Sequence, residues 1–106
     1  MKADFGKYIR ELRKKEGLTL TQLGAKLGID SGALSKIETG KRELNENTLP
    51  LLAEAFNLDL EKLKEELLSE KIANTIYDNN CNENVLALAE QKIKYLKSRK
   101  VKIRKK

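Results

Sequence analysis

Residues 18–42, which read LTLTQLGAKLGIDSGALSKIETGKR, decide the fold of this chain. The segment divides into two short helices, at about 20–27 and 31–39, separated by the tripeptide Gly28-Ile29-Asp30. Thr19 and Asp30 stand where helix N-caps are needed, because their side-chain oxygens can accept from free backbone N–H groups. Gly28 stands where a helix ends and the backbone turns left-handed. Two short helices joined by such a turn predict a helix-turn-helix.

The apolar residues of this segment indicate how the two helices hold together. Gly24 lies within the first helix, where a small residue lets the second helix pack closely. The side chains expected to point inward are Leu23, Leu27, Ile29, Leu34 and Ile37. The opposite face of the helix at 31–39 then remains free, and in a helix-turn-helix that face enters the major groove of DNA.

The rest of the chain also has the features of helix. Leu, Lys, Glu, Ala and Ile dominate, there is a single Pro, and apolar residues recur at helical spacing. Pro50 favours a helix start near Asn47 over one near Asn45, since proline is tolerated in the first helical turn. A polar break is expected at 78–82. The further helices expected in this all-α protein are 3–16, 48–56, one from 60 to beyond 70, and one after Asn82 that reaches about residue 96.

The net charge of +6 is unevenly distributed. Residues 1–42 carry ten basic and five acidic side chains, residues 43–96 carry five and eleven, and residues 97–106 carry seven and none. The basic ends would be attracted to a polyanion, whereas the acidic middle would be repelled by DNA and is expected to lie away from it. The basic tail is interpreted as a solvated end, an expression artefact or, as we favour, a flexible arm that neutralises phosphates.

Several functional classes are excluded by what the sequence lacks. There is no His, and the one cysteine, Cys81, cannot form an internal disulfide, which fits a reducing cytoplasm. No Gly-rich phosphate loop or cluster of carboxylates suggests catalysis, and no segment resembles a signal peptide or a membrane span. We expect a cytoplasmic protein that is not an enzyme and has no cofactor, no metal site and no membrane contact.

A combination of residues resembles the phage repressor and Cro family, also called the XRE-type regulators. The resemblance covers residues 3–63 and implies a five-helix, lambda-repressor-like DNA-binding domain of bacterial or phage origin, nucleoid-associated when bound. Residues beyond about 70 look loosely like the two-helix extensions of some small regulators, including controllers of restriction–modification operons. The residues that carry the resemblance are Gly24, Gly28-Ile29, Leu34, Ser35-Lys36-Ile37-Glu38, Gly40-Lys41-Arg42 and a Leu/Ala-rich fourth helix.

The resemblance also implies which side chains meet DNA. The second helix of such a domain abuts the phosphate backbone and the third reads bases, with Ser31, Gly32 and Lys36 at base-contacting positions. Ser31 and Gly32 replace the long amides that bind adenine, so Lys36 is the only strong base reader, with guanine as its target. We therefore expect few direct base contacts and a larger share from DNA shape. The full expected set is Thr19, Thr21, Gln22, Ser31, Gly32, Ser35, Lys36, Thr39, Lys41 and Arg42.

Two other positions bear on this comparison. Leu20 departs from the family pattern, because many relatives have a Gln there that bonds a phosphate, so Thr19 or Thr21 would have to supply a hydroxyl. Arg13 and Glu38 match an internal ion pair of relatives that ties the first helix to the third. We expect that pair to be partly exposed and to contribute roughly 0–1 kcal/mol.

The apolar residues from the start of the fifth helix onward need a partner. Two helices added to a closed domain have little core to join. We divide the chain into a DNA-binding domain at 1–66, a helical extension at 67–97 of one long or two short helices, and a flexible basic tail at 98–106. A homodimer is expected, because two-fold proteins read two-fold operators. The expected dimerisation residues are Leu67, Leu68, Ile72, Ile76, Leu86, Ala89, Ile93 and Leu96.

The sequence thus predicts a homodimeric transcriptional repressor that binds double-stranded DNA sequence-specifically with the helix at 31–39. Two alternatives stay open. One is the antitoxin of a toxin–antitoxin pair, in which residues 60–97 bind a different protein, and the other is the controller of a restriction–modification operon. A protein-binding module without DNA binding is a third class, against which the basic face of the second and third helices argues.

Overall fold

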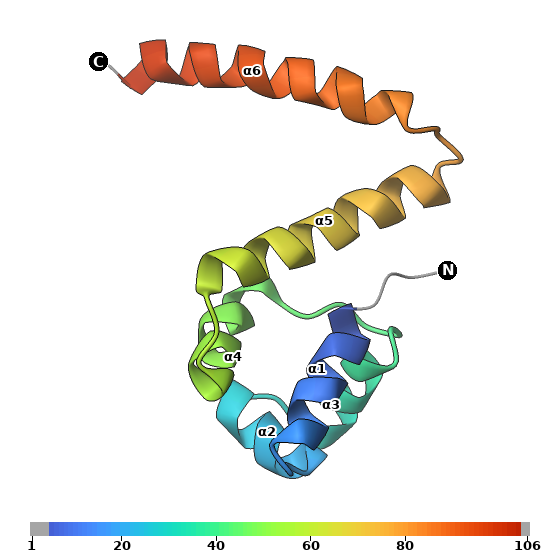
Figure 1. Cartoon of the computed structure of the whole chain (residues 1–106), viewed down its shortest axis with the longest axis vertical. Coiled ribbons are helices and arrows are strands. Elements are labelled where there is room, and N and C mark those ends of the chain that lie inside the picture. Colours follow the sequence, from blue (N-terminus) through green and yellow to red (C-terminus); the bar gives the residue numbers. More distant parts are fainter. Residues whose placement is uncertain (1–4, 105–106) are drawn as a thin grey trace. The chain divides into compact units, whose positions relative to one another are not determined.

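The computed structural model describes the backbone of residues 5–104 and the side chains of residues 5–99. The prediction of an all-α fold is confirmed, and the chain divides into two compact units, Met1–Asn74 and Thr75–Lys106. The division falls inside a helix and later than the predicted boundary at residue 66. Within the described range the elements are α1 (Phe5–Lys15), α2 (Leu20–Leu27), α3 (Ser31–Glu38), the 3₁₀ turn η1 (Glu46–Thr48), α4 (Leu49–Phe56), α5 (Leu60–Asp78) and α6 (Asn84–Arg104) (Figure 1).

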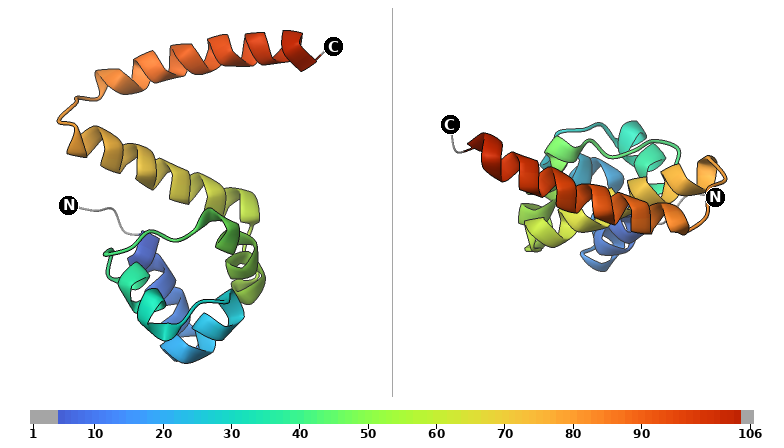
Figure 2. Two further views of the ribbon diagram at one scale, coloured as in Figure 1. Left: turned by 180° about the vertical axis from the view of Figure 1, so that it is seen from behind. Right: turned by 90° about the horizontal axis from the view of Figure 1, so that it is seen from above.

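The first unit is built around one hydrophobic core. Helix α3 packs against both α1 and α2, and α2 also packs against α4 (Figure 2). Four of the five residues expected to point inward are buried, and the fifth, Ile29, is partly buried against the same core. The core consists of Phe5, Ile9, Leu23, Leu27, Leu34, Ile37, Leu44, Leu49, Leu52, Ala53, Leu63 and Leu67.

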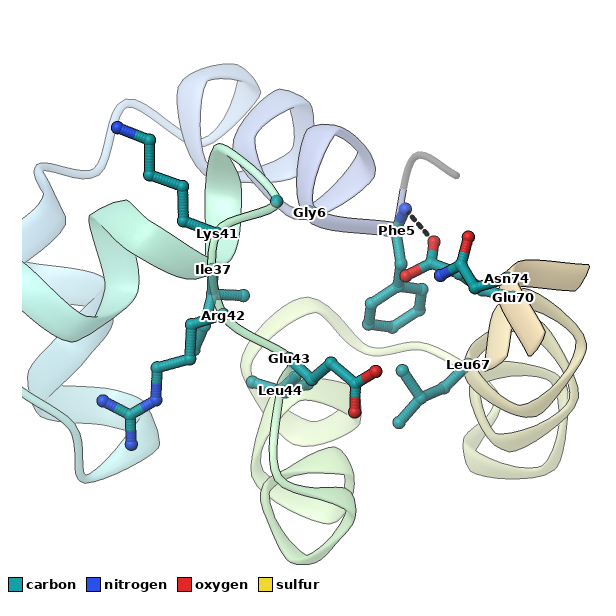
Figure 3. A pocket seen from close by; sticks show the side chains of 11 residues that line it. Phe5, Gly6, Ile37, Lys41, Arg42, Glu43, Leu44, Leu67, Glu70 and Asn74 are labelled. Atoms are coloured by element: carbon teal, nitrogen blue, oxygen red, sulfur yellow. Dashed lines mark hydrogen bonds between the residues drawn. The ribbon is translucent and has the colours of Figure 1, made fainter. Parts of the chain in front are cut away.

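Helix α5 closes the first unit by packing on the start of α1. The backbone N–H of Phe5 donates to Oε1 of Glu70 at 2.6 Å, so a carboxylate from α5 satisfies one of the free donors of the α1 N-terminus. Asn74 is also buried there, and a small cavity of about 80 Å³ remains between these residues and the loop after α3 (Figure 3). Pockets for small molecules measure roughly 300–1,000 Å³, so we assign this cavity no ligand.

One predicted dimerisation residue is thereby corrected. The side chain of Leu67 is only 4% exposed and belongs to the core of the first unit. It cannot contact a partner while that core is intact. Because Leu67 and Leu68 are adjacent, their side chains point in directions about 100° apart, and only Leu68 faces water.

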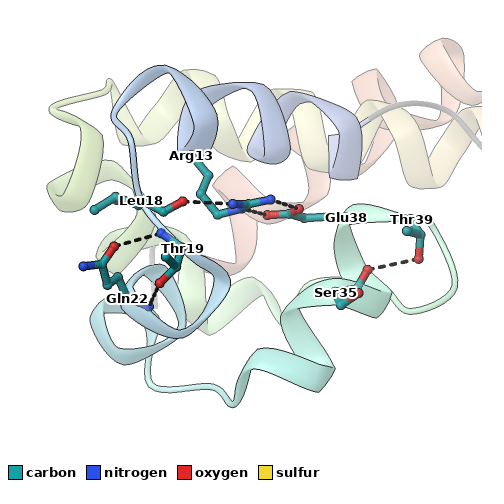
Figure 4. A network of polar contacts seen from close by, with 7 residues as sticks. All are labelled: Arg13, Leu18, Thr19, Gln22, Ser35, Glu38 and Thr39. Atoms are coloured by element: carbon teal, nitrogen blue, oxygen red, sulfur yellow. Dashed lines mark hydrogen bonds and ion pairs between the residues drawn. The ribbon is translucent and has the colours of Figure 1, made fainter.

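The ends of the helix-turn-helix follow the capping rules. Thr19 and Gln22 form a capping box: the N–H of Gln22 donates to Oγ1 of Thr19 at 3.0 Å, and the N–H of Thr19 donates to Oε1 of Gln22 at 2.8 Å (Figure 4). The carboxylate of Asp30 accepts from the N–H of Ala33 at 2.7 Å. Gly28 ends α2 in the left-handed region, at φ 73°. The predicted caps are therefore confirmed.

The start of α4 lies close to the predicted one, and a 3₁₀ turn precedes it. The side chain of Asn45 accepts from the N–H of Asn47 at 2.8 Å and begins the turn η1, after which α4 starts at Leu49. Pro50 does lie in the first turn of α4, as expected. The α-helix itself starts close to the predicted position near Asn47, and Asn45 caps only the 3₁₀ turn that precedes it.

The second unit contains the end of α5, a turn and α6. The side chain of Asn82 accepts from the N–H of Asn84 at 2.9 Å, which confirms the helix start predicted there. Helix α6 continues to Arg104, so the described part of the predicted flexible tail, 98–104, is helical, while residues 105–106 lie outside the described range. Lys and Arg are good helix formers, and no Gly or Pro interrupts the sequence there. Among the described residues, no helix is both long and apolar enough to cross a membrane.

Candidate nucleic-acid interface

The two helices of the motif approach each other closely at Gly24. A Cβ atom on Gly24 would lie 2.5 Å from the carbonyl oxygen of Ile29, so any side chain there would push the turn away from α2. Leu20, which departs from the family pattern, is partly buried against the core. Its side chain therefore stabilises the packing of α2, a contribution that a glutamine at this position would not make.

The outer face of α3 is exposed and polar. Ser31, Gly32 and Lys36 are exposed, and Ser35 is half-buried. Ser31 and Gly32 are small, so the backbone of α3 can come close to a partner surface. The side chain of Lys36 reaches farther out than either of them. Every predicted base-contacting position thus lies on one short helix, and Ser35 is the least accessible of them.

The loop after α3 is held to that helix by its backbone. The carbonyl oxygen of Lys36 accepts from the N–H of Lys41 at 2.8 Å and from the N–H of Arg42 at 3.2 Å, and Gly40 permits the reversal with φ 79°. The side chains of Lys41 and Arg42 are exposed and point away from the cavity behind the loop (Figure 3). Two cations therefore stand next to the exposed face of α3.

Three of the predicted DNA-contacting side chains already make hydrogen bonds within the chain. The capping box uses the amide oxygen of Gln22 and leaves its NH₂ group as a donor, and it uses Oγ1 of Thr19 as an acceptor, which leaves the hydroxyl proton. The hydroxyl of Thr39 donates to the carbonyls of Ser35 at 3.0 Å and Lys36 at 3.2 Å. Thr39 would have to give up these bonds to donate to a phosphate, whereas Thr19 and Gln22 would not.

The predicted pair between Arg13 and Glu38 is present, and it is buried. Nε of Arg13 lies 2.7 Å from Oε2 of Glu38 and Nη2 lies 3.1 Å from Oε1, while Nη1 donates to the carbonyl of Leu18 at 2.9 Å (Figure 4). The side chains are 11% and 4% exposed, so the pair is more buried than expected, and Arg13 is the more exposed of the two. The hydrogen bond to Glu38 raises the pKa of Arg13 above its ordinary value; burial opposes this effect, and the charge of Glu38 adds to it.

A second close approach, between α1 and α3, was missed by the sequence analysis. A Cβ atom on Gly6 would overlap the carbonyl oxygen of Ile37, near the end of α3. Gly6 thus sets how closely α1 lies against α3. A glycine inside an otherwise helical segment was the available signal, because it is costly there unless close packing requires it.

The structure also separates the predicted functional residues into two groups. The predicted DNA-contacting residues all lie on α2, on α3 or directly after α3, within the first unit. The predicted dimerisation residues lie on α5 and α6, and apart from Leu67 they are exposed or half-buried. The residues predicted to contact DNA and those predicted to form a dimer thus lie on different helices.

Comparison with known proteins also supports a helix-turn-helix in this chain. A family model described as helix-turn-helix matches residues 9–63, just over half of the chain. The chain is 53% identical over 38 residues to the uncharacterized HTH-type transcriptional regulator RghRB of Bacillus subtilis (strain 168), which is 36% of this chain and 27% of that protein. It is 38% identical over 60 residues to the HTH-type transcriptional repressor RghR of the same organism, and this match covers 56% of this chain and 44% of that protein. The chain thus spans less than half the length of these relatives.

Two solved structures resemble this chain. The restriction-modification controller protein C.AhdI from Aeromonas hydrophila matches 56% of this chain and 86% of its own, with a TM-score of 0.50 and 30% identity. The clp gene regulator ClgR from Corynebacterium glutamicum matches 79% of this chain and 87% of its own, with a TM-score of 0.50 and 21% identity. This likeness concerns the fold alone. With its fold, its capped helix-turn-helix and the family match in agreement, the chain belongs to the helix-turn-helix family of XRE-type transcriptional regulators.

Proposed function

We propose that this chain binds double-stranded DNA sequence-specifically, with α3 in the major groove. The observation that carries the proposal is the exposed, polar outer face of α3 beside the cations of Lys41 and Arg42. A groove lined by phosphates requires this arrangement, in which neutral donors and a lysine face the bases and cations flank them. The acidic stretch of α5 lies outside this surface, as electrostatic repulsion from DNA requires.

Each part of the surface has a separate task. Lys36 donates to the acceptor oxygen and nitrogen of a guanine, and Lys41, Arg42, Thr19 and Gln22 supply donors to phosphates. Ser31 and Gly32 add little direct readout, so part of the specificity comes from the shape of the DNA. Thr21, Ser35 and Thr39 complete the proposed set of DNA-contacting residues.

We further propose that two copies bind together and act as a repressor. One α3 presents few base readers, so a second half-site supplies the specificity that one lacks, and occlusion of a promoter requires only binding. The 30% identity to C.AhdI, whose structure is matched over 86% of its length, favours control of a restriction–modification operon as the second candidate.

The deciding experiment is selection of bound duplexes from a random DNA library at about physiological salt. We expect a two-fold symmetric motif whose half-sites are about one helical turn apart. Binding without enrichment would instead assign the chain an electrostatic, sequence-independent role. Absence of binding to any duplex would contradict the proposal and turn attention to a protein partner.

The contribution of Lys36 can be measured separately. Lys36→Ala should weaken specific binding by roughly 1–3 kcal/mol per half-site and relax the preference at one base position. Lys62→Ala is a matched control, because Lys62 is an exposed helical lysine on α5, away from the interface. Repeating the selection with both variants tests the assignment, and an unchanged motif for Lys36→Ala would contradict it.

A further inference from the structure

The described part of the second unit has no hydrophobic core of its own. Among its described side chains, residues 75–99, no hydrophobic side chain is buried, although α6 alone has 21 residues. Apolar surface of this extent on a helix marks a contact with another protein segment. The large apolar residues exposed on α6 are Leu86, Leu88, Ile93, Tyr95 and Leu96.

Helix α5 has a second apolar stripe besides the one in the core. Leu63 and Leu67 face the core at 3% and 4% exposure, whereas Leu68 and Ile72 are 55% and 44% exposed. At 100° per residue, Leu68 and Ile72 lie on the same side of the helix, largely opposite the core side, and Ile76 continues their stripe one turn later. We define the outer face of α5 as Glu65, Leu68, Ile72 and Ile76, of which the first three are exposed and Ile76 is half-buried.

One face of α6 has a similar pattern to the outer face of α5, but in the opposite order along the chain and with a cation in place of the anion. Leu86, Ala89, Ile93 and Lys97 lie on one side of that helix, so three apolar residues are followed by a cation. On α5 an anion, Glu65, is followed by three apolar residues. The interval from Glu65 to Ile76 equals that from Leu86 to Lys97. An antiparallel pair would therefore bring Ile76 beside Leu86, apolar residues beside apolar residues, and Glu65 beside Lys97.

We propose that the occupant of this outer face is α6 of a second copy, so that two chains exchange α6 helices across a two-fold axis. Charge favours this pairing, since α6 carries seven basic and one acidic residue and a parallel α6–α6 pair would bring the cationic ends together. Leu88 and Tyr95 lie on another side of α6, and one neighbouring helix cannot cover both sides. Four helices from two copies can, as in a helix bundle.

This inference rests on the proposed pairing of two copies, and it specifies the contact. The test uses the full chain with Glu65→Lys and Lys97→Glu. Either change alone places like charges together at both symmetry-related contacts and should raise the dimer dissociation constant roughly tenfold, measured by light scattering after size exclusion. An equimolar mixture should restore dimers as a heterodimer, because both contacts are then attractive. Pairing of α6 with α5 of its own chain would give no rescue on mixing.

A hydrophobic variant gives an independent check. Leu68→Glu should convert the chain to monomer, while Leu51→Glu, at an exposed leucine of α4, should leave the dimer intact. A monomeric wild-type chain at micromolar concentration, or charge variants that mixing does not rescue, would overturn the inference. Duplex selection separates the two proposals: a monomer that enriches a half-site motif defeats only the pairing, and a rescued dimer that binds no duplex defeats only the proposed function.

Discussion

Arg13→Ala should lower the free energy of unfolding by about 3–5 kcal/mol, because it leaves the carboxylate of Glu38 buried without a partner. The same change also removes the donor that satisfies the carbonyl of Leu18. Folded domains are stable by roughly 5–15 kcal/mol, so this loss would bring a small domain close to its limit. Urea denaturation followed by circular dichroism measures it directly.

The matched control removes both charges at once. Arg13→Met combined with Glu38→Leu should cost far less than the single change, since no buried charge is left uncompensated. A single variant that loses less than about 1 kcal/mol would show that the pair behaves as an exposed one. Because pairing raises the pKa of Arg13, its stabilising effect is complete below the ordinary arginine value and is lost only at still higher pH. We therefore expect no pH dependence from Arg13 across the neutral range.

Gly6→Ala should destabilise the fold by roughly 3 kcal/mol or more, because the new methyl group meets a backbone carbonyl that cannot rotate away. The helices α1 and α3 would have to separate, which also lengthens the contacts between Arg13 and Glu38. Gly24→Ala, with its Cβ at 2.5 Å from the Ile29 oxygen, should cost about 1–3 kcal/mol. Thermal unfolding of both variants tests the order of the two effects.

Gly32→Ala provides the comparison for these glycines. Its Cβ would lie 3.3 Å from a side-chain oxygen of Asp30, which can move, and the position is exposed within a helix. Alanine there should leave stability unchanged or raise it by up to about 1 kcal/mol. An equal change in stability at Gly6 and Gly32 would show that close packing does not distinguish the two positions.

The elements of the helix-turn-helix were predictable because their signals are local. A cap, the first turn and the terminal glycine lie within a few residues of one another, so Thr19, Asp30 and Gly28 could each be interpreted without knowledge of the fold. The inward side chains followed from helical spacing alone. The same reasoning identified the outer face of α3, since the face opposite a buried stripe is exposed.

The remaining features depend on contacts between distant segments. Glu70 reaches the start of α1 across 65 positions, and no local pattern distinguishes it from the solvated glutamates nearby. Spacing could not decide which of the two stripes of α5 enters the core, so Leu67 and Leu68 were assigned together. Burial of the pair between Arg13 and Glu38 likewise required the packing of α1 on α3 to be known.

The loop after α3 has a consequence for how such a protein changes over generations. Its position is held by backbone hydrogen bonds to the carbonyl of Lys36, which every residue type except proline can make at positions 41 and 42. If Lys41 and Arg42 bind phosphates as proposed, substitutions at these two positions can strengthen or weaken that attraction while the loop stays in place. Binding strength is open to gradual mutational adjustment there, whereas Gly6, Gly24 and Arg13 tolerate almost no change.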